Sequence, residues 1–296
     1  MVRDEVIRLA DGRALAFAEF GDPRGVPILF FHGNPMSRLF CPDEAATAAA
    51  RVRLITLDRP GFGRSDLKPS RTVAEWADDV GALAQALDIA RFTVVGVSAG
   101  GKYAAACAAR MPSRLTGVAV VSGAFGPLGE QPGALERLSS QSRQLYELAQ
   151  TDPWRAATTA TEQLEARARQ LADHPERLLN DDTRLSDADR WFLTDPRRVG
   201  FDRSVSEAVQ QGALGWAWER IAALRPWGFR LEESPIEVHL WHGAHDPEES
   251  QADVGWWASK IPLGRVMLWP DAGHYAFVKH WADVLDALLA IRPASQ

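Results

Sequence analysis

The stretch VVGVSAGGKY, residues Val94–Tyr103, decides how the rest of the chain is interpreted. A run of apolar β-formers leads to Ser98, glycines flank this serine, and mostly small residues follow as far as Arg110. The segment Gly96–Gly100 fits the pattern G-x-S-x-G between a strand and a helix. A strand that turns at once into a helix forces the serine into a strained backbone conformation, so its neighbours must be small. We therefore expect the Ser98 side chain at the carboxyl edge of a sheet, where α/β sheets bind ligands.

Strand and helix patterns alternate on both sides of this stretch. A hairpin signal at Asp11-Gly12 joins two short strands, and further apolar runs of the kind buried in parallel sheets end at small or polar residues. This alternation predicts an α/β fold with a mostly parallel, doubly wound sheet. The expected strands are residues 6–9, 14–20, 27–31, 53–57, 92–97, 115–121, 236–241 and 265–269, and the expected helices are residues 72–87, 99–110 and 278–291.

The alternation stops in the middle of the chain. Between about residues 125 and 230 there is no clear strand, and amphipathic helical patterns cover residues 135–149, 153–172 and 204–224. We therefore predict a core made of residues 1–125 and 231–296, with residues 126–230 inserted as a helical cap.

Composition excludes several classes of protein. The 296 residues carry a net charge of -6, so no basic surface attracts nucleic acid. The two cysteines, Cys41 and Cys107, have neither metal-ligand nor redox spacing. There is no signal-peptide pattern and no apolar run of about 18 residues, so we expect a cytoplasmic protein without a membrane partner. The expected partner is a small-molecule substrate, and the expected state is a monomer or homodimer.

A serine hydroxyl is a weak nucleophile without a base. His274 follows the last predicted strand, and Asp246 follows the strand before it, so both should lie at the same sheet edge as Ser98. The order Ser98, Asp246, His274 is the nucleophile–acid–histidine order of this architecture. His245 remains an alternative base, and Glu248 or Glu249 an alternative acid.

An acyl-transfer site also needs donors for the oxyanion that forms during attack. The N–H of Ala99, directly after the nucleophile, is one candidate. The loop His32-Gly33-Asn34-Pro35 follows another strand, and Asn34 could present its backbone N–H and its side-chain amide. We therefore predict an oxyanion hole formed by Asn34 and Ala99.

Together these segments resemble the α/β-hydrolase superfamily, in the branch with a helical cap. The resemblance implies a serine hydrolase with a Ser98, His274 and Asp246 triad, and no cofactor or metal. The loop containing Asn34 is similar to that of haloalkane dehalogenases, which use an aspartate nucleophile, but Ser98 argues against that chemistry. The matching pieces are His32–Pro35, Asp58–Asp66, Gly96–Gly101, Trp241–Gly243 with Asp246, and Ala272–His274.

The cap is rich in tryptophan, which suggests an apolar or aromatic substrate. Trp191 and Trp216 are candidate substrate-binding residues, although cap tryptophans can equally pack the cap onto the core. Lys102 either faces solvent or meets an acidic group on the substrate or cap. The favoured reaction is hydrolysis of an ester or lactone. Two alternatives stay open: a non-hydrolytic enzyme, such as an acyltransferase, lyase or cyclase, and a small-molecule receptor.

Overall fold

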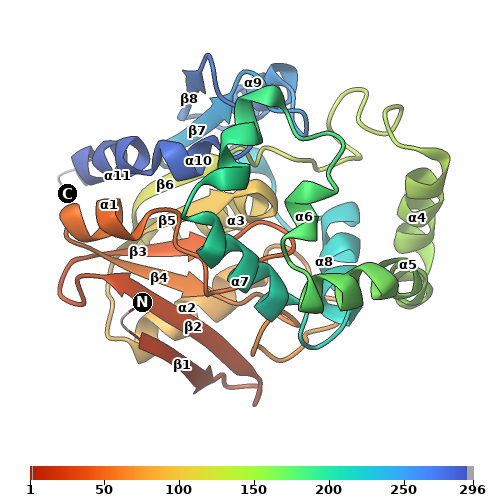
Figure 1. Cartoon of the computed structure of the whole chain (residues 1–296), viewed down its shortest axis with the longest axis horizontal. Coiled ribbons are helices and arrows are strands. Elements are labelled where there is room, and N and C mark those ends of the chain that lie inside the picture. The colour runs from red at the N-terminus through yellow and green to blue at the C-terminus, as the bar shows by residue number, and fades with distance from the viewer. Residues whose placement is uncertain (2, 292–296) are drawn as a thin grey trace.

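A computed structural model describes residue 1 and residues 3–291 of the chain. Its centre is one eight-stranded sheet in the order β1-β2-β4-β3-β5-β6-β7-β8 (Figure 1). The pairs β1/β2 and β2/β4 are antiparallel, and all pairs from β4 to β8 are parallel. The prediction of a mostly parallel α/β sheet is confirmed. The strands are β1 (Arg3–Arg8), β2 (Ala14–Gly21), β3 (Val26–Phe31), β4 (Val52–Leu57), β5 (Phe92–Val97), β6 (Leu115–Val121), β7 (Val238–Gly243) and β8 (Gly264–Trp269).

Helices cover both faces of this sheet, so apolar side chains are buried on both sides. One face packs against α2 (Trp76–Ala86), α3 (Gly101–Arg110) and α9 (Gln251–Lys260). The other packs against α1 (Glu44–Ala49) and α11 (Trp281–Ala290). Successive residues of β3 alternate between these two cores, because strand side chains point to opposite faces.

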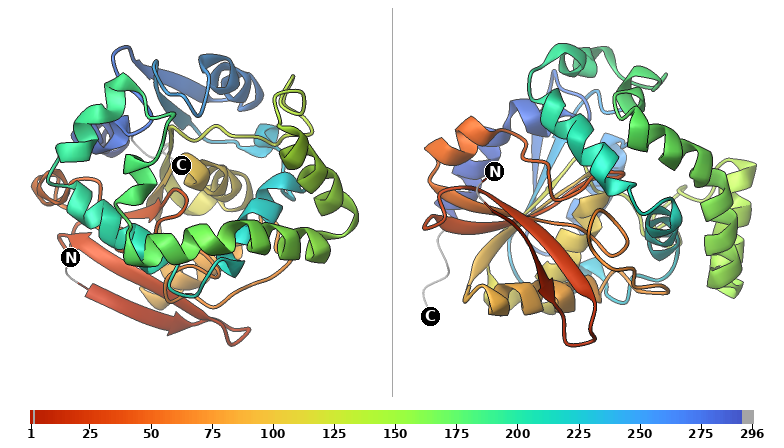
Figure 2. Two further views of the ribbon diagram at one scale, coloured as in Figure 1. Left: turned by 45° about the vertical axis from the view of Figure 1, so that its right-hand side comes forward. Right: turned by 60° about the horizontal axis from the view of Figure 1, so that its bottom comes forward.

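The helices between β6 and β7 gather on one side of the sheet (Figure 2), except the 3-10 helix η4 (Leu231–Glu233), which packs on α3 and α9 of the core. Their apolar residues pack partly on one another and partly on the core. The limits 126 and 230 of the cap stay a prediction. These elements are α4 (Ser140–Thr151), α5 (Pro153–Asp173), α6 (Arg177–Asn180), the 3-10 helix η3 (Asp187–Thr194), α7 (Arg198–Ala208) and α8 (Leu214–Leu224).

Two helix predictions are wrong in detail. The single helix expected over residues 204–224 is two helices, α7 and α8, because Gly212 between them adopts a left-handed φ of 83°. The helix expected over residues 278–291 divides at His280 into α10 (Ala276–Lys279) and α11. In the part of the chain that the structure covers, no helix has the length and apolar character needed to cross a bilayer.

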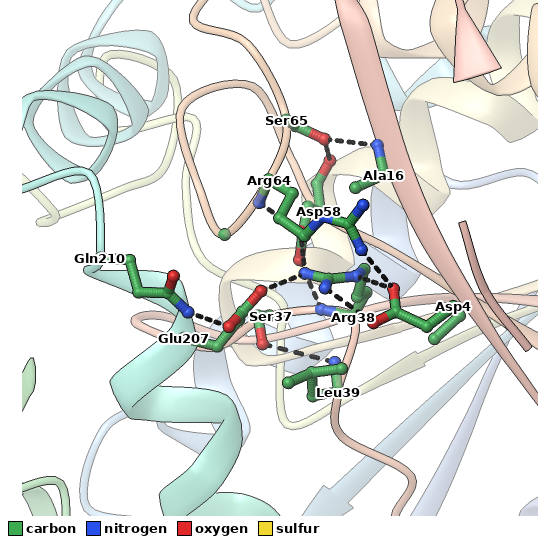
Figure 3. Close-up of polar contacts among 12 residues, drawn as sticks. Asp4, Ala16, Ser37, Arg38, Leu39, Asp58, Arg64, Ser65, Glu207 and Gln210 are labelled. Atoms are coloured by element: carbon green, nitrogen blue, oxygen red, sulfur yellow. Dashed lines mark hydrogen bonds and ion pairs between the residues drawn. The ribbon is translucent and has the colours of Figure 1, made fainter. Parts of the chain in front are cut away.

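A buried ion cluster fastens α7 of the cap to the core (Figure 3). Arg38 is 1% exposed, and its guanidinium lies 2.7 Å from Asp58, 2.6 Å from Glu207 of α7 and 2.7 Å from Asp4 of β1. Asp58 also accepts hydrogen bonds from the backbone N–H groups of Arg38 and Arg64, at 2.6 and 2.9 Å. One arginine therefore joins the cap, the edge strand and the loop after β4.

We expect Arg38→Ala to lower the free energy of unfolding by about 3–5 kcal/mol, because it leaves the buried Asp58 carboxylate without its cation. Denaturant titration measures this. The matched control is Arg64→Ala, whose side chain is 47% exposed and pairs with Asp4 at 3.3 Å. Its loss should stay below about 1 kcal/mol. Equal losses in the two variants would contradict the importance of the buried cluster.

Candidate active site

Ser98 lies at the sharp turn between β5 and α3. Its φ is 50°, in the left-handed region, as the sequence pattern predicts. A Cβ on Gly96 would lie 2.3 Å from the carbonyl oxygen of Gly100, and one on Gly100 would lie 2.1 Å from that of Phe31. The backbone segments therefore touch with no space for side chains, which explains the small residues on both sides of Ser98.

Ser98, His274 and Asp246 come together from three separate loops. The Oγ of Ser98 lies 3.1 Å from Nε2 of His274, and Nδ1 of His274 lies 2.9 Å from Oδ2 of Asp246. The side chain of Asp246 is fully buried. Its Oδ1 accepts hydrogen bonds from the backbone N–H groups of Glu248 and Glu249, at 2.8 and 3.3 Å. The arrangement is a continuous hydrogen-bonded path from a hydroxyl to a carboxylate.

The alternative base, His245, and the alternative acids, Glu248 and Glu249, do not take the places of His274 and Asp246 in this path. His245 lines an open groove with Asp187 and Asp271, and Ser98 is not among the residues that line this groove. The carboxylate of Glu248 pairs with Arg184 at 2.7 Å. Neither Glu248 nor Glu249 takes the place of Asp246 beside the Nδ1 of His274.

Glu249 instead faces His242, with Oε2 at 3.3 Å from Nδ1. Donor atoms of His242, Asp246 and Glu249 lie within 4.8 Å of one another, which is a spacing that could hold a metal ion. Both oxygens of Asp246, however, already accept hydrogen bonds from protein groups. We therefore assign no ion to this group.

The loop with Asn34 packs directly on Ser98. A Cβ on Gly33 would lie 3.0 Å from the Cβ of Ser98, and Asn34 lines the same cavity as Ser98 and His274. The guanidinium of Arg59 donates to Oδ1 of Asn34 and to the carbonyl oxygen of His32. Because Arg59 occupies Oδ1, the two N–H donors of the Asn34 side chain remain for another acceptor.

The cavity beside Ser98 has a volume of about 130 Å³. None of the candidate substrate-binding residues Trp191, Trp216 and Lys102 lines it. Trp191 lines a separate pocket with Trp269, and Trp216 packs partly buried against the core. The cavity is lined by Asn34, Ser98, Leu178, Asp182, Arg184, Leu185, Asp189, Pro247, Glu248, His274 and Tyr275.

Lys102 does not face solvent, so that alternative is wrong. It is 5% exposed, and its Nζ lies 2.9 Å from Oε1 of Glu219 on cap helix α8 and donates to the carbonyl oxygen of Ala99 at 2.7 Å. The structure agrees with the other alternative, in which Lys102 meets an acidic group on the cap, here Glu219. A substrate contact of Lys102 stays a prediction.

Glu219 is the centre of a larger buried cluster. Its Oε2 lies 2.7 Å from Arg71 and 3.3 Å from Arg59, and it accepts a hydrogen bond from the hydroxyl of Tyr103 at 2.6 Å. Burial alone would raise the pKa of Glu219, but the charges of Arg59, Lys102 and Arg71 hold it well below its usual range. Burial lowers the pKa of Lys102.

Sequence reasoning did not assign roles to Arg59 or Glu219. Arg59 lies inside the segment Asp58–Asp66, which is one of the segments that carry the resemblance. Its place in this segment could have indicated a role near the site. Glu219 is one acidic residue in an otherwise mostly apolar helix, LGWAWERIAAL. A lone carboxylate among buried apolar residues needs a cationic partner, and this pattern could have indicated the cluster.

Comparison with known proteins gives consistent results. A family model described as alpha/beta hydrolase fold matches residues 26–280. A Mycobacterium tuberculosis protein, named as a member of the non-heme bromoperoxidases, is 28% identical over 269 residues, which cover 90% of this chain and 93% of that protein.

Two solved structures illustrate the structural likeness. An esterase from Rhodococcus sp. ECU1013 has a TM-score of 0.67 at 19% identity, covering 98% of this chain and 100% of that one. An enol-lactonase from Burkholderia xenovorans LB400 has a TM-score of 0.66 at 21% identity, covering 97% of this chain and 99% of that one. At these identities the likeness is one of fold.

We expect Glu219→Gln to lower the free energy of unfolding by about 3–5 kcal/mol, because three buried cations lose their shared carboxylate. Thermal and denaturant unfolding measure the loss. Glu162→Gln, at an exposed position of α5, is the control and should change stability by less than about 0.5 kcal/mol. A Glu219→Gln protein as stable as this control would show that the cluster contributes little.

Proposed function

The chain belongs to the α/β-hydrolase fold family, and from this premise we propose that it is a serine hydrolase that cleaves a small ester or lactone through an acyl-enzyme on Ser98. The observation that carries the proposal is the path from the Ser98 hydroxyl through the His274 ring to the Asp246 carboxylate, with contacts of 3.1 and 2.9 Å. Such a path supplies a base and an orienting acid to a serine hydroxyl.

In the first half of the reaction, Nε2 of His274 takes the proton of Ser98 as Oγ bonds to the carbonyl carbon. Negative charge develops on the carbonyl oxygen, where the N–H groups of Ala99 and Asn34 would donate. His274 then gives its proton to the departing alkoxide oxygen, and the ester bond breaks. Asp246 holds the ring in the tautomer with a proton on Nδ1 and stabilises the imidazolium.

In the second half, water replaces the alcohol. His274 removes a proton from the water, whose oxygen bonds to the acyl carbon, and the proton returns to Oγ of Ser98 as the acid departs. Arg59 supports both halves indirectly, because it holds the Oδ1 of Asn34 and leaves the amide N–H groups available to the oxyanion.

The cavity narrows the substrate class that we propose. A volume of about 130 Å³ is below the roughly 300–1,000 Å³ of sites for drug-sized ligands. It therefore favours an acyl group of few atoms. Leu178, Leu185 and Pro247 supply apolar surface, whereas the charged lining, apart from His274 itself, consists of three carboxylates and one guanidinium. An uncharged acyl group suits this lining better than one that carries a carboxylate.

We expect a fluorophosphonate to form one covalent adduct with the wild-type protein and none with Ser98→Ala, because only an activated serine attacks the phosphorus. Intact-mass measurement detects the adduct. The same pair is then assayed with p-nitrophenyl esters of increasing chain length, where acetate should exceed longer chains. Full ester activity in Ser98→Ala would overturn the proposal. An adduct without turnover of any ester or lactone would instead favour the acyltransferase alternative.

The pH dependence of kcat/KM tests the base. Burial lowers the pKa of His274, but the charge of Asp246 and the hydrogen bond to it outweigh burial and raise the pKa to about 9. Only the neutral ring accepts the Ser98 proton. We therefore expect kcat/KM to rise about tenfold per pH unit at lower pH and to level off above about pH 9. At each pH, the rate measured with Ser98→Ala is subtracted as the background hydrolysis. A plateau that already begins near neutral pH would contradict a raised pKa.

A further inference from the structure

Asp189 of the cap contacts the loop that carries His274. This residue belongs to η3 and is fully buried. Its Oδ2 accepts a hydrogen bond from the backbone N–H of His274 at 2.8 Å, and its Oδ1 accepts one from that of Tyr275 at 2.9 Å. The hydroxyl of Ser186 donates to Oδ2 at 2.7 Å. One carboxylate from the cap therefore holds two successive backbone groups of the histidine loop.

The two segments fit together without free space. A Cβ on Gly273 would lie 2.1 Å from Oδ2 of Asp189 and 2.5 Å from Oγ of Ser186. Next to this contact, the ring of Phe192 stacks on that of Tyr275, with ring centroids 5.3 Å apart. The contact is thus part of a packed interface between the cap and the loop.

We propose that Asp189 is a positioning residue for His274, which makes the alignment of His274 with Ser98 depend on the cap. This inference rests on the proposed function of His274 as the base. Asp246 holds the imidazole ring through Nδ1, whereas Asp189, on η3, holds the backbone N–H of the same residue. Hydrogen bonds to an ionised carboxylate are stronger than neutral ones, so the second anchor is a firm one.

A positioning role matters because the Ser98–His274 contact has little tolerance. Displacement of a catalytic group by about 1 Å can lower the rate about 100-fold. Without Asp189, two buried N–H groups would lose their acceptor, and the loop would have to shift to find others. The side chain of His274 would move with the loop.

Asp189 also acts on the charge of the His274 ring. Burial lowers the pKa of His274, and nearby carboxylates, including Asp189, raise it. Removal of the Asp189 charge should therefore lower this pKa, which a purely structural role would not do. The charged groups near His274 are Asp246, Glu248 and Glu249 on the loop after β7, Asp189 on η3, and Asp182 and Arg184 on the segment between α6 and η3. Arg184 pairs with Glu248.

The test is Asp189→Asn, compared with Asp187→Asn. Asp187 lies in the same 3-10 helix, but its side chain is 96% exposed and pairs with Arg190. In Asp189→Asn we expect kcat on a short ester to fall about 10- to 100-fold, with KM changed less than about twofold. The midpoint of the pH profile should move to lower pH. Asp187→Asn should match the wild type in all three quantities.

A second readout does not need turnover. In a Ser98→Ala background, the ring of His274 is titrated by NMR, and Asp189→Asn should lower its midpoint whereas Asp187→Asn should not. If Asp189→Asn does not fold, Ser186→Ala replaces it, because it removes one hydrogen bond from the carboxylate and keeps the charge. We then expect a smaller fall in kcat with an unchanged KM.

The outcomes separate the two proposals. If Ser98 forms the fluorophosphonate adduct and Asp189→Asn behaves like Asp187→Asn in kcat, pH profile and ring titration, the positioning role is overturned while the proposed function stands. For Ser186→Ala, a kcat equal to that of the wild type would overturn it likewise. If Ser98→Ala keeps full activity, the proposed function fails, and the ring titration still reports whether Asp189 acts on His274.

Discussion

The left-handed backbone of Ser98 is the constraint on which the rest of the structure depends. A non-glycine residue with a φ of 50° is strained, and it persists only where its surroundings hold it. The close backbone approaches at Gly96 and Gly100 do this, together with the ammonium of Lys102, which donates to the carbonyl of Ala99 in the next turn. The strain projects the Ser98 hydroxyl beyond the sheet edge, where the loops after β3, β7 and β8 can reach it.

The cap takes part in this arrangement through three carboxylates. Glu207 contacts Arg38 and so the buried Asp58, Glu219 contacts Arg59 and the start of α3, and Asp189 contacts the histidine loop. Each belongs to a different cap element, and each contacts a different part of the core. The contacts of Glu207 and Glu219 are buried ion pairs, which add little net stability compared with apolar packing. The contact of Asp189 consists of hydrogen bonds from backbone N–H groups. The cap is thus attached to the loop after β3, to the start of α3 and to the loop that carries His274.

Much of the fold could be predicted because its signals are local. A hairpin signal indicated the first two strands and apolar runs indicated the other six, while the spacing of glycines around Ser98 indicated the turn. Asp246 and His274 could be chosen because each follows a strand, and the structure brings both to Ser98. The break at Gly212 was missed, since amphipathic periodicity continues across a single glycine that turns the chain.

The sequence by itself therefore determined the strands and the loops that meet at one sheet edge, because strand periodicity and turn chemistry act over a few residues. Tertiary structure alone decided which buried charges meet. Lys102 pairs with Glu219 across 117 positions, and Asp189 reaches His274 across 85. No local pattern links such residues, since a buried carboxylate is satisfied by whichever donors the packed cap and core bring within about 3 Å of it.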